Sequence, residues 1–262
     1  MPTAAYTRHM SIPAPVTAAV LLIGDEILSG RTQDGHLQTI AKFVGPLGVQ
    51  IREARVVSDT EDLIIAAVNE LRARYTYVFT TGGIGPTHDD ITADAMAKAF
   101  GVPISVRADA RAILEAHYKT KDINEARLRM ARIPDTALLI DNPVSRAPGF
   151  QIGNVFVMAG VPSVMRGMLD DVGRRLHGGA VVQARTVRAK GAREGDLAAS
   201  LRDLQTRFES VSLGSYPWYF QDGSGVQLVA RSTDVEALEA ATRELLVLVR
   251  GLGVEPELLA DA

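Results

Sequence analysis

The sequence predicts an α/β protein with three layers, in which a mostly parallel sheet carries helices on both faces and a small α+β unit follows. From residue 16 to residue 177, apolar strand-like runs alternate with stripes of apolar residues at helical spacing. This alternation is typical of a parallel sheet that is buried on both faces. After the glycine pair at 178–179 the order changes to strand, helix, strand, strand, helix. That order is typical of a ferredoxin-like α+β unit.

The elements of the first unit follow from these runs in chain order. We expect strands at residues 16–23, 49–57, 77–81, 137–140, 149–152 and 155–158. We expect helices where apolar residues recur every three or four positions, in segments 37–44, 63–71, 91–99, 107–132 and 165–172. Thr32 is the expected N-cap of the first of these helices.

The chain is expected to consist of three parts. Residues 1–15 contain two prolines just before the first strand and are predicted to be a mobile tail. Residues 16–177 form the parallel unit, and residues 180–255 form the small C-terminal unit. In the latter we expect strands at 181–189, 211–216 and 226–230, with helices through 197–208 and 235–249.

Composition excludes several classes of function. The net charge is −3 and the basic residues are scattered, which argues against a nucleic-acid partner. The chain has no cysteine, which excludes disulfides, thiolate metal sites and a cysteine nucleophile. The N-terminus does not resemble a secretory signal, and the longest apolar run, 16–24, is too short to span a membrane. We therefore expect a cytoplasmic protein with no membrane partner.

The strongest functional signal is the loop at residues 80–90, with the sequence TTGGIGPTHDD, between a buried strand and a helix. Ligands bind at the carboxyl ends of parallel strands, and glycines let backbone N–H groups approach an anion beside a helix N-terminus. Two interpretations remain open: a cradle for a phosphate, or a tight turn in which Asp89 or Asp90 caps the helix. The spacing matches neither the dinucleotide fingerprint nor a P-loop.

Carboxylates surround the predicted ligand position. Asp89 and Asp90 would repel a phosphate unless a divalent cation bridged the two, so both are candidate metal ligands. Asp25 and Glu26 follow the first strand, and Asp59 follows the second, at the edge where parallel strands end together. Asp59 lies within a Ser-x-x-Glu pattern at 58–61, which favours the alternative that it belongs to a helix cap.

A further strand-to-helix junction lies at residues 159–163. Pro162 fits a rigid turn at a pocket wall, and Ser163 is either a site residue or a helix N-cap. The chain has no Gly-x-Ser-x-Gly elbow and no histidine pair at metal-ligand spacing. A serine hydrolase and a zinc enzyme are therefore not supported.

Together, the segments 23–30, 57–60 and 80–92 resemble the MoaB/Mog-type molybdopterin-binding domains. The loop pattern Gly-Gly-x-Gly-Pro-Thr-x-Asp-Asp is most similar to the N-terminal domain of CinA and to the molybdopterin-binding domain of eukaryotic FAD synthetases. Further similarities lie at 124–127, 142–143, 147–150, 160–163 and 214–217.

The resemblance implies a MoaB/Mog-like fold with its ligand at the strand ends, and a homo-oligomer. It also implies divalent-metal-dependent hydrolysis of a nucleotide pyrophosphate such as ADP-ribose or FAD, with Mg²⁺, Mn²⁺ or Co²⁺. The alternative is a non-catalytic protein that binds molybdopterin. The expected catalytic residues are Asp59 and Asp90, and the expected metal ligands are Asp59, Asp89 and Asp90. The expected ligand-binding residues are Gly24, Asp25, Glu26, Thr81, Gly82, Gly83, Gly85, Pro86, Pro162 and Ser163.

Overall fold

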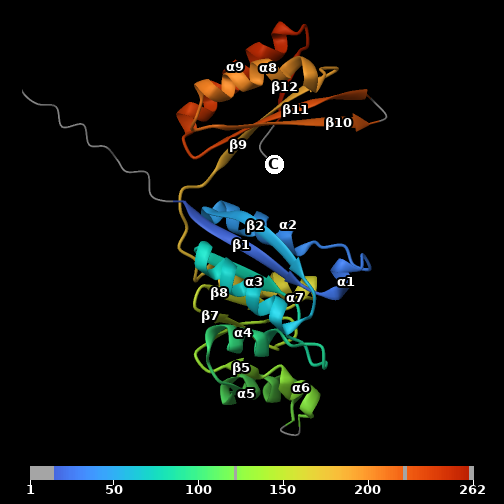
Figure 1. Ribbon diagram of the computed structural model, residues 1–262, viewed down its shortest axis with the longest axis vertical. Helices are drawn as coiled ribbons and strands as arrows, with labels where there is room; N and C mark the ends of the chain where they lie inside the picture. The colour runs from blue at the N-terminus through green and yellow to red at the C-terminus, as the bar shows by residue number, and fades with distance from the viewer. Residues whose placement is uncertain (1–14, 121–122, 221–222, 260–262) are drawn as a thin grey trace, which may run out of the picture. The chain divides into compact units, whose positions relative to one another are not determined.

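The computed structural model describes residues 15–120, 123–220 and 223–259, and it confirms the predicted fold class (Figure 1). The chain divides into two compact units, the first ending at Gly179 and the second beginning at Ala180. The predicted mobile tail falls almost entirely on residues 1–14, which lie outside the described residues. Within the described ranges, no helix combines the length and the apolar character needed to cross a membrane.

The first unit contains a six-stranded sheet in the order β2-β1-β3-β8-β7-β6. Its parallel part consists of β1 (Val16–Ile23), β2 (Val49–Val57), β3 (Tyr77–Thr81) and β8 (Val155–Met158). Two short antiparallel strands, β7 (Gly149–Ile152) and β6 (Leu138–Ile140), complete one edge. The strands β3 and β8 are buried along their whole length, and their sequences are apolar apart from the two threonines that end β3.

Two hydrophobic cores lie on the two faces of this sheet. Successive side chains of β1 point to opposite faces, so Leu21 packs in one core and Leu22 in the other. The core that holds Leu21 is covered by α3 (Glu61–Arg74), α4 (Thr92–Phe100) and α5 (Ala108–Tyr118). The core that holds Leu22 is covered by α2 (His36–Val44) and α7 (Pro162–Gly173). Short helices α1 (Asp25–Leu28) and η1 (Gly45–Leu47) complete the connections.

The edge strand β2 contains an irregularity. Ala18 of β1 pairs with Ile51, whereas the next residue, Ala19, pairs with Glu53, so Arg52 is an extra residue in β2. This is a β-bulge, which shifts the alternation of side chains by one position. Ile51 accordingly packs in the core under α2 and α7, whereas Val57 packs in the core on the opposite face.

The structure corrects two predictions in this unit. Segment 107–132 is not one helix: α5 ends at Tyr118, its C-cap Lys119 has a left-handed φ of 54°, and a short α6 (Glu125–Arg129) follows. Arg132 instead begins the strand β5 (Arg132–Pro134), which pairs with β4 (Ile104–Val106). Thr32 is not the N-cap of α2, because the carboxylate of Asp34 accepts the N–H groups at the start of that helix.

The second unit is an antiparallel four-stranded sheet with α8 (Glu194–Arg207) and α9 (Val235–Gly251) on one face (Figure 1). Its strands are β9 (Gln183–Lys190), β10 (Ser212–Phe220), β11 (Gly223–Ser232) and β12 (Pro256–Leu259). The order β10-β11-β9-β12 agrees with the predicted ferredoxin-like arrangement. The short final strand β12 was missed, because only four residues pair along β9.

Candidate functional site

A cavity of about 480 Å³ lies where the parallel strands of the first unit end. Its wall includes Ile23 at the end of β1, Asp59 after β2, the glycine-rich loop after β3, and the residues Ala159 to Val161 after β8. This volume lies within the range of small-molecule sites, and the carboxyl edge of a parallel sheet is where ligands of open α/β folds bind. The cavity is therefore the candidate site.

The structure brings together most, but not all, of the predicted site residues. Those that line the cavity are Glu26, Asp59, Gly82, Gly83, Gly85, Pro86, Asp89 and Asp90. Those that do not line it are Gly24, Asp25, Thr81, Pro162 and Ser163. Thr81 is buried inside β3, and Pro162 and Ser163 are exposed in the first turn of α7, whose N-cap is Val161.

The cavity is also lined by residues that the predicted site list does not contain, among them the polar or flexible side chains of Met130, Asn142 and Ser145, and Gly160. Asn142 and Gly160 belong to segments that resemble the family, so a signal for them was present. The side chain of Asn142 is buried and holds its own loop, donating to the Ala147 carbonyl at 2.7 Å and accepting from the Val144 N–H at 3.0 Å. Met130 and Ser145 carry no sequence signal.

Two glycines of the loop cannot be replaced without distortion. Gly82 and Gly83 have φ values of 105° and 66°, in the left-handed region that favours glycine. A Cβ on Gly82 would lie 2.1 Å from the carbonyl oxygen of Ile23, and one on Gly83 would lie 2.1 Å from Thr92 Oγ1. The loop is thus a tight turn packed against β1 and α4, and at the same time one wall of the cavity.

The acidic turn, defined here as Thr87 to Asp90, is closed by one carboxylate oxygen. Asp90 Oδ2 accepts hydrogen bonds from the backbone N–H of Thr87, at 2.8 Å, and from the Thr87 hydroxyl. The following helix α4 has Ile91 as its N-cap and no side-chain cap, so neither Asp89 nor Asp90 caps it. The capping alternative for these two residues is wrong, and the second oxygen of Asp90 accepts no hydrogen bond from the described residues.

We expect Thr87→Val to loosen this turn modestly. The variant loses the hydroxyl bond to Asp90 and keeps the backbone bond, so the free energy of unfolding should fall by about 1 kcal/mol. Urea unfolding measures the change. A loss above about 3 kcal/mol would contradict the assignment of a single exposed hydrogen bond.

Asp59 does not cap α3, the helix that follows it. No side chain caps α3, and Asp59 Oδ2 accepts the backbone N–H of Asp25 at 3.0 Å, which joins the ends of β2 and β1. Partial burial raises the pKa of Asp59, the hydrogen bond from Asp25 opposes this, and the nearby charges of Asp25, Glu26 and Asp89 raise it further. Asp59 is therefore a carboxylate held where negative charge is unfavourable.

Asp89 behaves differently from Asp59. Hydrogen bonding with Thr87 and with its own backbone lowers the pKa of Asp89, and the charges of His88 and Arg129 add to this effect. Its side chain is exposed, so it stays ionised at the mouth of the cavity. Two neighbouring carboxylates of this site thus have pKa values that shift in opposite directions.

The site does not form a complete metal cage. Within the described parts of the chain, no three His, Asp or Glu side chains lie close enough together to hold a metal ion. Mg²⁺ typically takes one or two protein carboxylates and completes its shell with water and substrate phosphates. The described residues therefore supply at most part of a cation's ligand shell.

Each of the two units matches a known protein family. Residues 19–178 match the family described as probable molybdopterin binding domain, and residues 182–256 match the middle domain of FAD synthase. A crystal structure of CinA from Thermoplasma acidophilum, described as having unknown function, is 35% identical with a TM-score of 0.58. It covers 61% of this chain and 96% of its own.

Relatives that match over more of the chain agree with this result. A protein of Pyrobaculum calidifontis is 31% identical over 211 residues, which are 77% of this chain and 80% of that protein. A CinA-like protein of Gemmatimonas aurantiaca is 31% identical over 245 residues, which are 88% of this chain but only 57% of that protein. The chain thus spans little more than half of the latter. It belongs to the molybdopterin-binding domain family, in which its relatives include CinA-like proteins.

Proposed function

We propose that this protein binds a nucleotide diphosphate in the cavity and hydrolyses its pyrophosphate bond with the help of a divalent cation. ADP-ribose-like and FAD-like molecules are the proposed substrates. The observation that carries the proposal is the convergence of a glycine-rich backbone with Asp59, Asp89 and Asp90, which come from two different strand ends, around one cavity. The neighbouring match to the middle domain of FAD synthase supports a nucleotide ligand.

The residues would divide the chemistry between them. The backbone of Gly82, Gly83 and Gly85 would hold one phosphate, and the carboxylates of Asp59, Asp89 and Asp90 would hold the cation. When bound, the cation polarises a phosphoryl oxygen and lowers the pKa of coordinated water. Asp59, with its raised pKa, is suited to accept the proton of the attacking water. The water oxygen joins one phosphorus, the P–O–P bond breaks, and two monophosphates leave.

A second function is favoured by one specific observation. The family that matches residues 19–178 is described by molybdopterin binding and not by hydrolysis. A pterin with its phosphate also suits a cavity of this size. In this alternative the same loop holds the pterin phosphate, and no bond is broken.

The decisive experiment measures AMP release from ADP-ribose and from FAD with Mg²⁺, Mn²⁺ or Co²⁺. We expect turnover with at least one metal, complete loss in EDTA, and recovery when metal is restored. The control is Asp59→Asn, because Asp90→Ala would also open the acidic turn. If wild type never exceeds this control, the hydrolase proposal fails. Tight molybdopterin binding in that case would favour the second function.

A further inference from the structure

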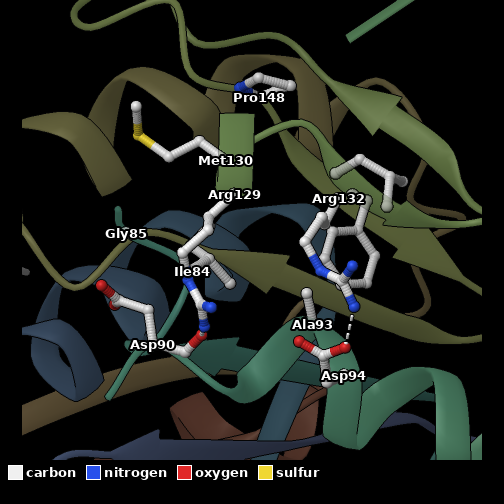
Figure 2. Close-up of a pocket in the computed structure, with 11 residues that line it drawn as sticks. Ile84, Gly85, Asp90, Ala93, Asp94, Arg129, Met130, Arg132 and Pro148 are labelled. Carbon is white, nitrogen blue, oxygen red and sulfur yellow. Dashed lines mark hydrogen bonds and ion pairs between the residues drawn. The ribbon is translucent and has the colours of Figure 1, made fainter. Parts of the chain in front are cut away.

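Arg129, the last residue of α6, carries a positive charge that has no role in the proposed hydrolysis. Its Nη2 donates to the backbone carbonyl of Asp90 at 3.1 Å, and its Nε–H is buried without an acceptor among the described residues. Figure 2 shows the side chain extending toward Asp90. Within the described chain no carboxylate forms an ion pair with it, whereas Arg132 in the same view pairs with Asp94.

Arg129 is half-buried, and a partly buried guanidinium without an ion pair, with its Nε–H buried and without an acceptor among the described residues, is unfavourable. Such a group is retained when its charge offsets another one nearby. Asp94 and Arg132 line the same small cavity as Arg129 but pair with each other. The remaining charges around Arg129 belong to the acidic turn, since its positive charge acts on the Asp89 carboxylate and its hydrogen bond holds the Asp90 carbonyl. The acidic turn and Arg129 therefore form one electrostatic unit.

Arg129 does not reach the ligand cavity itself. It lines a separate cavity of about 10 Å³, which is too small for any substrate group. The two cavities share Ile84, Gly85, Asp90 and Met130 in their walls. Arg129 thus lies behind the residues that face the ligand cavity and does not line that cavity itself.

We propose that Arg129 is a positioning residue that lets the acidic turn face an anionic ligand. It fixes the Asp90 carbonyl and offsets the negative charge of Asp89 and Asp90. This inference rests on the proposed function, because it requires a phosphate-bearing ligand in the cavity.

Removing this charge should shift two affinities in opposite directions. In Arg129→Gln the turn becomes more negative, so Mn²⁺ should bind about three- to tenfold more tightly and ADP-ribose without metal about three- to tenfold more weakly. A purely structural role predicts something else, because a loosened loop weakens both ligands. Arg129→Lys keeps the charge but not the planar geometry of the guanidinium, and should restore both affinities in large part.

The test is calorimetric titration of the full chain with Mn²⁺ alone and with ADP-ribose in EDTA. The matched control is Arg72→Gln, because Arg72 also donates to a backbone carbonyl, that of Ala99, at 3.0 Å, near the far end of α4 from the turn. We expect this control to change each affinity less than about twofold, since α4 separates the two sites by roughly 13 Å.

The outcomes distinguish the two proposals. If wild type binds both ligands and Arg129→Gln weakens both, changes neither, or matches Arg72→Gln, the inference is wrong and the proposed function stands. If wild type binds neither Mn²⁺ nor ADP-ribose, the proposed function fails and the inference fails with it.

Discussion

Replacing Asp59 with asparagine is expected to lower the rate of pyrophosphate hydrolysis by about 10²-fold or more and to stabilise the metal-free protein. The loss of rate follows from removing a carboxylate that accepts a proton or holds the cation. The gain in stability follows from the raised pKa of Asp59, because its negative charge is unfavourable in the fold. The asparagine oxygen still accepts the N–H of Asp25, so the link between β1 and β2 is kept.

The pH dependence of this gain has a defined sign. A carboxyl whose pKa is higher in the folded state than in the unfolded state binds its proton more tightly when folded. Wild type therefore loses stability as pH rises through the pKa of folded Asp59, and the loss is complete above it. The melting temperature of Asp59→Asn should exceed that of wild type in EDTA at pH 7 by about 1–3 °C. Below the ordinary pKa of aspartate, near 4, the two should coincide.

Asp62→Asn is the matched control for this variant. Asp62 is exposed in the first turn of α3, where a negative charge favours the helix. Its removal should leave turnover unchanged and should lower, not raise, the melting temperature at pH 7. If both variants stabilise the protein equally, the effect reflects net charge and not the surroundings of Asp59. If Asp59→Asn keeps its activity, Asp59 has no part in the reaction.

Gly82→Ala is expected to destabilise the protein by about 2–5 kcal/mol, the combined cost of a left-handed alanine and an unrelieved overlap. The new Cβ would lie 2.1 Å from the Ile23 carbonyl oxygen. Since that carbonyl belongs to the buried end of β1, the loop must move away instead. Ligand binding should be lost together with stability. Thermal unfolding should show a decrease of about 5–15 °C.

Gly101→Ala separates the two contributions to this effect. Gly101 follows α4 with φ at 65°, and a Cβ there would meet no atom within 4 Å. In this variant only the left-handed backbone conformation is unfavourable, so the free energy of unfolding should fall by about 1 kcal/mol. The variant should bind ligand as wild type does. Equal destabilisation by the two alanines would show that the close approach of Gly82 to β1 does not matter.

The part of the fold that the sequence predicts well is its buried centre. The strands at 16–23 and 77–81 have the predicted bounds, since largely apolar runs of this kind are typical of strands buried inside a parallel sheet. The half-exposed edge strand at 49–57 also has the predicted bounds. The failures lie where long-range pairing decides the structure. Arg132 has no local preference for a strand and adopts one because β4 lies beside it. Four residues of β12 likewise form a strand only through β9.

The candidate site shows the same limit. The glycines at 82 and 83 indicate a backbone with positive φ values. Their convergence with Asp59 follows from the parallel topology of the sheet. The hydrogen-bond partner of the Asp59 carboxylate could not be predicted, because the local pattern at 58–61 is that of a capping box. The contact that forms instead joins two residues 34 positions apart. Arg129 was missed for a similar reason, because no sequence motif marks an arginine whose contact with Asp90 lies 39 positions away.

The extra residue at Arg52 has a consequence for how this protein tolerates insertion and deletion. Before the bulge, Val49 and Ile51 face the core under α2 and α7, and after it Val57 faces the opposite core. The extra residue in β2 thus determines which face of the sheet each later side chain of that strand points to. A protein lacking that residue could keep every carboxylate of the site and still present Asp59 one step, about 3.3 Å, away from the N–H of Asp25. The position of Asp59 at the edge of the sheet therefore depends on a β-bulge seven residues before it.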